Sequence, residues 1–164
     1  MILPAQTIRQ LCLSRSMVTP FSERTEVELS DGKKATFGLS SAGYDIRLDE
    51  AVILEPGGFV LASSREHFQM PDDVLAQVCD KSSWARRGVA VQNTIIEPGW
   101  CGYLTLEVTF HSSMVTTPSL YAPSLYIPSG TPIAQIVFMR LEARTEQPYV
   151  GKYQHQDRGP QEAR

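Results

Sequence analysis

The sequence predicts a mainly β protein with a short N-terminal helix, folded as a sandwich, jelly roll or distorted barrel. Many short apolar segments are separated by polar turns, and 11 glycines and 11 prolines are typical of such a chain. Helical spacing of apolar residues is clear only near the start, in residues 5–13, where Ile8, Leu11 and Cys12 share one face.

The other elements follow in chain order. Residues 14–40 are polar and are expected to be irregular, with a turn at Asp31-Gly32. Strands are expected at residues 44–48, 52–54, 59–62, 74–79, 89–91, 95–96, 103–110 and 133–141. Every second residue of the 103–110 segment is apolar, which predicts one buried face and one polar face that carries Glu107.

Two segments depart from this pattern. Residues 81–87 lack alternation and are expected to form one or two helical turns that end at Gly88. Residues 118–122 (Pro-Ser-Leu-Tyr-Ala) are nearly repeated in residues 123–127 (Pro-Ser-Leu-Tyr-Ile). Two copies are too few for a solenoid, so we interpret them as an extended hairpin loop that runs into a strand.

Composition limits the function classes. A chain of 164 residues fits one domain (1–164), and its net charge of −3 disfavours nucleic-acid binding, which needs a broad basic face. No apolar run approaches the ~18 residues that span a membrane, and the N-terminus lacks a secretion signal. Cys12, Cys79 and Cys101 lie far apart, which disfavours a disulfide framework or a cysteine zinc site. We therefore expect a cytoplasmic protein.

Segment 81–87 is a candidate phosphate site. If it is helical, Ser82 and Arg86 share one face, and Ser83 and Arg87 share the next. Hydroxyls beside arginines and backbone N–H groups suit phosphate oxygens. The alternative is a solvated surface turn.

Glu107 is a candidate general acid or base. Glutamate is a poor strand former, so its place in an alternating strand needs a reason. Either the polar face simply meets solvent, or the side chain points into a site. In a partly dry pocket the pKa of a carboxyl rises, which suits proton transfer near neutral pH.

Other polar and aromatic residues carry weaker signals. Asp45 and Arg47 are expected on an exposed face or in an ion pair. Trp84 and Trp100 are expected in the core. The histidines have no partner spacing and are expected at the surface; they are His67, His111 and His155.

Taken in order, five segments resemble the dCTP deaminase branch of the dUTPase-like superfamily, over about residues 40–160. The segments are Ser41 to Leu48, Lys81 to Arg86, Glu97 to Glu107, Gly130 to Phe138 and Gly151 to Gln156. The resemblance implies a dUTPase-like subunit, a distorted β-barrel or jelly roll, and a homotrimer with active sites between subunits. It also implies dCTP carried with Mg²⁺ as substrate, dUTP and ammonia as products, and dTTP as a candidate inhibitor.

The resemblance implies catalytic roles for residues of two segments. Glu107 matches the general acid/base, whereas Ser82 and Arg86 match residues around the base and the attacking water. Lys81, Ser82 and Ser83 match the phosphate-side loop. One carboxylate can activate water at C4, protonate N3 and protonate the leaving ammonia in turn, while an arginine orients the water. The HxE…PCxxC signature of zinc deaminases is absent, so a zinc-independent mechanism is expected.

The resemblance extends into the C-terminal tail. Tyr149, Lys152 and Gln156 match positions that fold over the triphosphate. Residues 150–164 are therefore expected to form a mobile tail that becomes ordered with nucleotide. The match is imperfect, because one extra residue separates Gln156 from the following Gly-Pro and residues 111–124 look like a loop insertion.

Two alternatives remain open. A dUTP pyrophosphatase, or a bifunctional enzyme that makes dUMP from dCTP, shares the motif of residues 42–45, although a glycine-rich GFGSTG-like tail is absent. A non-catalytic nucleotide-binding regulator is the other alternative, and the intact Glu107 and Arg86 argue against it. Base-modified cytosine nucleotides are also candidate substrates.

Overall fold

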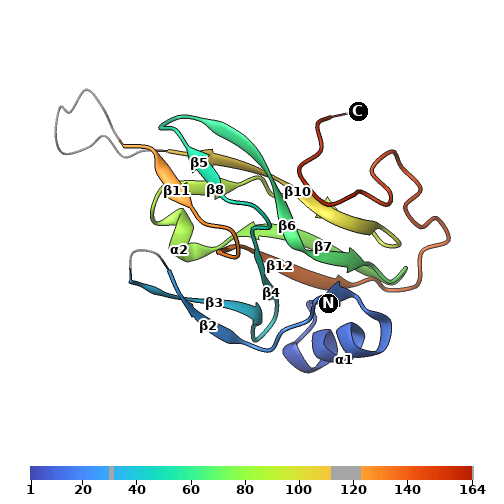
Figure 1. Cartoon of the computed structure of the whole chain (residues 1–164). Coiled ribbons are helices and arrows are strands. Elements are labelled where there is room, and N and C mark those ends of the chain that lie inside the picture. Colours follow the sequence, from blue (N-terminus) through green and yellow to red (C-terminus); the bar gives the residue numbers. More distant parts are fainter. Residues whose placement is uncertain (30–31, 112–122, 164) are drawn as a thin grey trace.

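Two antiparallel β-sheets share one hydrophobic core in a computed structural model, which describes residues 1–29, 32–111 and 123–163 (Figure 1). In chain order the elements are α1 (Ala5–Arg15), β1 (Val18–Thr19), β2 (Thr25–Glu28), β3 (Lys34–Leu39), β4 (Tyr44–Arg47), β5 (Val52–Leu54), β6 (Phe59–Gln69), β7 (Val74–Asp80), α2 (Ser82–Ala85), β8 (Val89–Val91), β9 (Ile95–Ile96), β10 (Cys101–Phe110), β11 (Leu125–Ile127) and β12 (Pro132–Arg140).

The sheets have simple strand orders. The larger sheet runs β2-β3-β4-β12-β7-β9, the second runs β1-β6-β10-β8, and β5 pairs with β11 in a separate ribbon. This confirms the mainly β prediction. The longest contact between strands is that of β10 with β6, and Figure 1 shows the C-terminal tail returning toward this pair.

The N-terminal helix is confirmed and is slightly longer than predicted. Ile8, Leu11 and Cys12 are buried, so the predicted face is the one that packs. The helix ends at Ser16, whose left-handed conformation lets its N–H donate to the Cys12 carbonyl. No helix among the described residues is long and apolar enough to cross a membrane.

The prediction that residues 14–40 are irregular is wrong. This region contains β1 and the β2–β3 hairpin, in which Thr25 pairs with Phe37. Strand β2 is mostly exposed, and the buried residues of β3 are consecutive (37–39), so the sequence lacks the apolar alternation of a half-buried strand. The turn near Gly32 lies where it was expected, whereas Asp31 is outside the described residues.

Strand β6 is also longer than the predicted segment 59–62. Beyond residue 62 the strand contains Ser63, Ser64 and Glu66, which are polar yet fully buried. The Ser64 hydroxyl accepts from the Leu104 N–H at 2.9 Å, so its burial is satisfied by the neighbouring strand. A sequence pattern based on hydrophobicity ends the strand too early here.

The predicted insertion at 111–124 lies mostly outside the described residues, as does the first copy of the repeat. The second copy contains β11, whose Tyr126 pairs with Ile53 of β5. The predicted strand at the end of the repeat is therefore confirmed.

Candidate active site

The candidate site lies on the outer face of the β6–β10 pair. Leu104, Leu106 and Val108 of β10 turn into the core, as the alternation predicts. The alternate residues face outward, and Glu107 lies directly opposite Leu61 of β6. Cross-strand neighbours share one face, so β6 supplies half of the surface around Glu107.

A cavity of about 560 Å³ opens over this face. Strands β6 and β10 form its floor through Leu61, Thr105 and Glu107. Strand β9 with its flanking residues 94 and 97 lines the cavity together with Trp100. The C-terminal tail closes over it with Tyr149, Tyr153, Gln156 and residues 161–163. Three predicted site residues therefore come together in one chain: Glu107, Tyr149 and Gln156.

The Glu107 carboxyl is suited to proton transfer. Its Oε2 atom is buried and has no hydrogen-bond partner among the described residues. Burial raises the pKa of Glu107, and a hydrogen bond to its own backbone only partly opposes that effect. An unpaired, partly desolvated carboxyl in a cavity is able to accept a proton from water and return it to a bound ligand.

Thr105 connects the site to the tail. Its hydroxyl accepts hydrogen bonds from the Gln156 amide and, at 3.0 Å, from the backbone N–H of Gln161. Gln156 is buried, although it belongs to the polar tail. Sequence analysis missed Thr105, but the alternation of β10 places it on the same face as Glu107.

The tail is held along the start of β10. The Trp100 indole N–H donates to the Tyr153 carbonyl at 2.8 Å, and the Tyr103 N–H donates to the Gln156 carbonyl at 3.0 Å. Gly102 permits this close approach, because a Cβ there would lie 2.7 Å from the Gln156 nitrogen. The tail and the start of β10 are therefore joined by hydrogen bonds from both backbone and side-chain groups.

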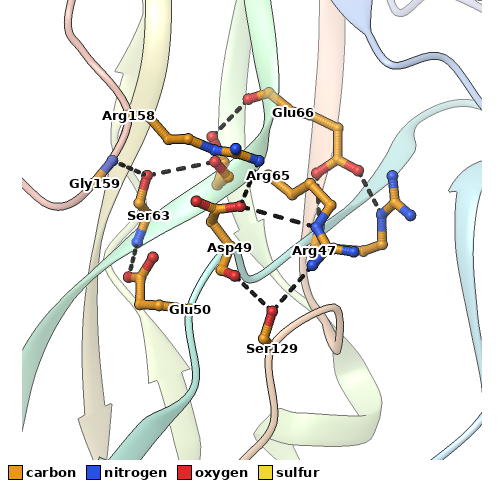
Figure 2. A network of polar contacts seen from close by, with 10 residues as sticks. Arg47, Asp49, Glu50, Ser63, Arg65, Glu66, Ser129, Arg158 and Gly159 are labelled. Atoms are coloured by element: carbon orange, nitrogen blue, oxygen red, sulfur yellow. Dashed lines mark hydrogen bonds and ion pairs between the residues drawn. The ribbon is translucent and has the colours of Figure 1, made fainter.

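A second attachment joins the tail to the barrel (Figure 2). Arg158 forms an ion pair with Asp49 at 2.8 Å, and the Gly159 N–H donates to the Ser63 hydroxyl at 3.2 Å. Asp49 also lies 3.9 Å from Arg65 of β6. These contacts orient the last residues of the chain toward the cavity.

Helix α2 lies apart from the Glu107 cavity within one chain. Its single turn begins at Ser82 and is followed by Gly88 with a φ of +82°, which confirms the predicted local structure. Trp84 anchors it, because its indole N–H donates to the Pro132 carbonyl at 2.6 Å. The predicted residues Ser82, Ser83 and Arg86 are exposed, and none of them lines the cavity.

Comparison with known proteins places this arrangement in a family. Residues 42–141 match the sequence model of a family described as dCTP deaminase-like. The chain belongs to the dCTP deaminase-like family. The matched region includes β10 with Glu107 and all of α2.

Full-length relatives agree with the family match. A protein named dCTP deaminase from Chlamydia caviae is 32% identical, over 91% of this chain and 92% of its own length. Another of that name, from Wolbachia sp. subsp. Brugia malayi, is 33% identical over 94% of each chain.

Solved structures show the same fold. The 2'-deoxycytidine 5'-triphosphate deaminase of Agrobacterium tumefaciens superposes with a TM-score of 0.61 at 18% identity, covering 84% of this chain and 47% of that chain. A dUTPase from phage phi11 of S. aureus gives a TM-score of 0.56 at 15% identity, covering 80% and 99%. The dUTPase-like fold is therefore confirmed for this dCTP deaminase-like chain.

Lys81 and Asp45 form an ion pair beneath α2 of this family member. The Lys81 ammonium contacts the Asp45 carboxylate, and their side chains are only 13% and 9% exposed. The alternative of an exposed face for Asp45 is therefore wrong, whereas an ion pair is confirmed. The second carboxylate oxygen, Oδ1, is buried with no partner among the described residues. Lys81 thus fixes the start of α2 to β4.

Arg47 also turns inward, against the exposed-face alternative. Its backbone N–H and side-chain Nε donate to the fully buried Glu66 carboxylate at 2.8 and 2.7 Å. The guanidinium lies 4.1 Å from the Phe37 ring centroid. Paired hydrogen bonds to a buried carboxylate allow two charges to share the interior.

The histidine prediction holds for His111 and His155, which are exposed, but is wrong for His67. His67 is half-buried, with its Nε2 3.6 Å from the Cys101 sulfur and its ring 5.0 Å from that of Tyr103. Both tryptophans are buried, as predicted.

Proposed function

We propose that this chain is a zinc-independent dCTP deaminase, which converts dCTP and water to dUTP and ammonia. The observation that carries the proposal is the unpartnered, buried Oε2 of Glu107 in a cavity beneath the tail. Relatives named dCTP deaminase over nine-tenths of the chain support the same reaction.

Glu107 performs the proton transfers in this proposal. The carboxylate removes a proton from water as the oxygen adds to C4 of cytosine, and it delivers that proton to N3. The second proton of the added hydroxyl passes through Glu107 to the amino group. Ammonia then leaves and the C4 carbonyl of dUTP forms. The raised pKa of Glu107 makes the protonated intermediate state easier to reach than it would be for an exposed carboxyl.

The tail and the α2 segment bind the triphosphate. We assign Tyr149, Lys152 and Gln156 to the tail side, and Lys81, Ser82 and Ser83 to the α2 side. Mg²⁺ bound to the phosphate oxygens neutralises their charge. This role needs no ligand cluster from the protein, and no group of three or more His, Cys, Asp or Glu residues in the described chain is placed to hold a metal ion.

Arg86 and Ser82 reach the reacting base from a neighbouring subunit in our proposal. They are exposed and lie outside the Glu107 cavity of their own chain, so a second copy has to supply them. We therefore propose a homotrimer with three sites between subunits.

We expect sedimentation to give about three times the 18.2 kDa chain mass, because each site needs two subunits.

Mixed trimers test the sharing directly. Glu107→Gln and Arg86→Ala chains, each with lowered activity alone, should regain activity when refolded together, since about a quarter of randomly mixed sites receive both intact residues. An 18.2 kDa species at working enzyme concentration, or no regain of activity, would contradict the shared site.

The reaction is tested by incubating the protein with dCTP and Mg²⁺ and identifying the products. We expect dUTP and ammonia in equal amounts, slower without Mg²⁺ and unchanged by a zinc-specific chelator. Production of dUMP and pyrophosphate would instead show the bifunctional enzyme, and nucleotide binding without turnover would show a regulator. Activity lost to the chelator and restored by zinc alone would overturn the carboxylate mechanism.

A further inference from the structure

The face that surrounds Glu107 changes polarity along the β6–β10 pair. On one side lie Thr105 and its cross-strand neighbour Ser63, both hydrogen-bonded to the tail. Leu61 lies directly across from Glu107 on β6, and Phe59 follows beyond it, opposite Thr109. Leu61 and Phe59 line the cavity, whereas Thr109 does not. Phe59 is 57% exposed, so the apolar side forms the open rim.

The edges of a cytosine ring match this order. C4, the atom attacked by water, lies between N3 on the polar edge and C5 on the apolar edge. Glu107 has to reach the water at C4 and also the N3 atom. We therefore place the N3 edge of the ring on the side of Thr105. The polar atoms of that edge can keep hydrogen bonds with the polar groups on this side. The C5–C6 edge then faces Leu61 and Phe59.

We propose that Leu61, with Phe59 at the rim, forms the wall that faces C5 of the pyrimidine and sets which C5 substituents are accepted. This inference rests on the proposed deamination. Leu61 is the residue for this role because it is paired directly with Glu107, and cross-strand side chains on one face lie in contact. A group added at C5 has to occupy the space that the Leu61 side chain fills.

The test compares kcat/KM for dCTP, 5-methyl-dCTP and 5-propynyl-dCTP in wild type, Leu61→Ala and Leu61→Phe. We expect Leu61→Ala to raise the ratio of 5-propynyl-dCTP to dCTP by at least about tenfold, within the range that apolar pockets reach when one group is removed. Leu61→Phe should lower the ratio for both substituted nucleotides. Val60→Ala is the matched control, because Val60 is on the same strand but packs against the core. In Val60→Ala the ratio of kcat/KM for 5-propynyl-dCTP to that for dCTP should stay within about threefold of the wild-type ratio.

The possible results separate the two proposals. If dCTP is deaminated but neither Leu61 variant shifts the ratio more than the Val60→Ala control, the wall assignment is overturned and the deaminase proposal stands. If wild type releases no ammonia from any cytosine nucleotide, the deaminase proposal fails and the wall fails with it. Circular dichroism identifies a variant that does not fold, in which case the other Leu61 variant decides the result.

Discussion

Glu107→Gln is expected to abolish most dCTP turnover while leaving dCTP binding largely intact. Glutamine keeps the shape of the side chain and its hydrogen bonding, but it cannot take a proton from water. General acid–base catalysis typically contributes about 10²–10⁴ in rate, and here one residue serves several transfers. Binding persists because the proposed triphosphate contacts come from the tail and from α2.

Single-turnover ammonia release and calorimetric dCTP binding measure the two effects separately. Glu97→Gln is the matched comparison, since Glu97 lines the same cavity but is exposed. Arg86→Ala should differ from both by weakening binding and turnover together, because it removes an orienting charge. If Glu107→Gln keeps more than about a tenth of wild-type turnover, Glu107 is a structural residue and Glu97 becomes the next candidate.

The Glu107→Gln variant also tests how the ionisation of Glu107 affects the stability of the fold. Burial raises the pKa of Glu107 above its ordinary value of 4.5, so the folded protein holds the proton more tightly than the unfolded chain. The stability that protonated Glu107 contributes is fully present below pH 4.5 and is lost as the pH rises through the pKa of Glu107 in the folded protein. Glutamine does not ionise. Glu107→Gln should therefore match or exceed the wild-type Tm at pH 7, and the advantage should shrink toward pH 4. A lower Tm at pH 7 would show that the carboxylate is stabilised in the fold.

Local patterns in the sequence predicted the elements that bury one regular face. Strand β10 alternates because one face meets the core, and α1 has helical spacing for the same reason. Burial of polar groups was not predictable in this way. Asp45 and Glu66 are inside only because Lys81 and Arg47 reach them from distant parts of the chain.

The candidate site was predictable in its residue types but not in its arrangement. Glu107 was identified from its polar position in an apolar strand, and the family resemblance identified the tail. The position of Leu61 beside Glu107 depends on the register between two strands, which tertiary packing determines. Arg86 lies outside the cavity of its own chain. In our proposal a second chain brings it there, which neither local sequence patterns nor one subunit can show.

Removal of the tail after Val150 should reduce kcat/KM for dCTP by on the order of 100-fold or more, because the substrate loses the groups that position it. Thr105 would lose both of its donors, Gln156 and Gln161. The barrel should still fold, since the core cluster and the residues packed against it include nothing beyond Tyr149. Turnover by ammonia release and subunit assembly by sedimentation test the two halves of this prediction.

Point variants within the tail sharpen the test. Gln156→Ala removes the amide that reaches Thr105, whereas Asp157→Ala changes an exposed neighbour in the same tail. Only the first should lower kcat/KM strongly. The ion pair of Arg158 with Asp49 is partly exposed, and such pairs typically contribute about 0–1 kcal/mol. This ion pair therefore adds little to the attachment of the tail. We expect dCTP to increase hydrogen-exchange protection across residues 151–163, because the nucleotide adds new contacts to the tail. Equal kinetics after truncation, or equal protection with and without dCTP, would refute a lid that closes on the substrate.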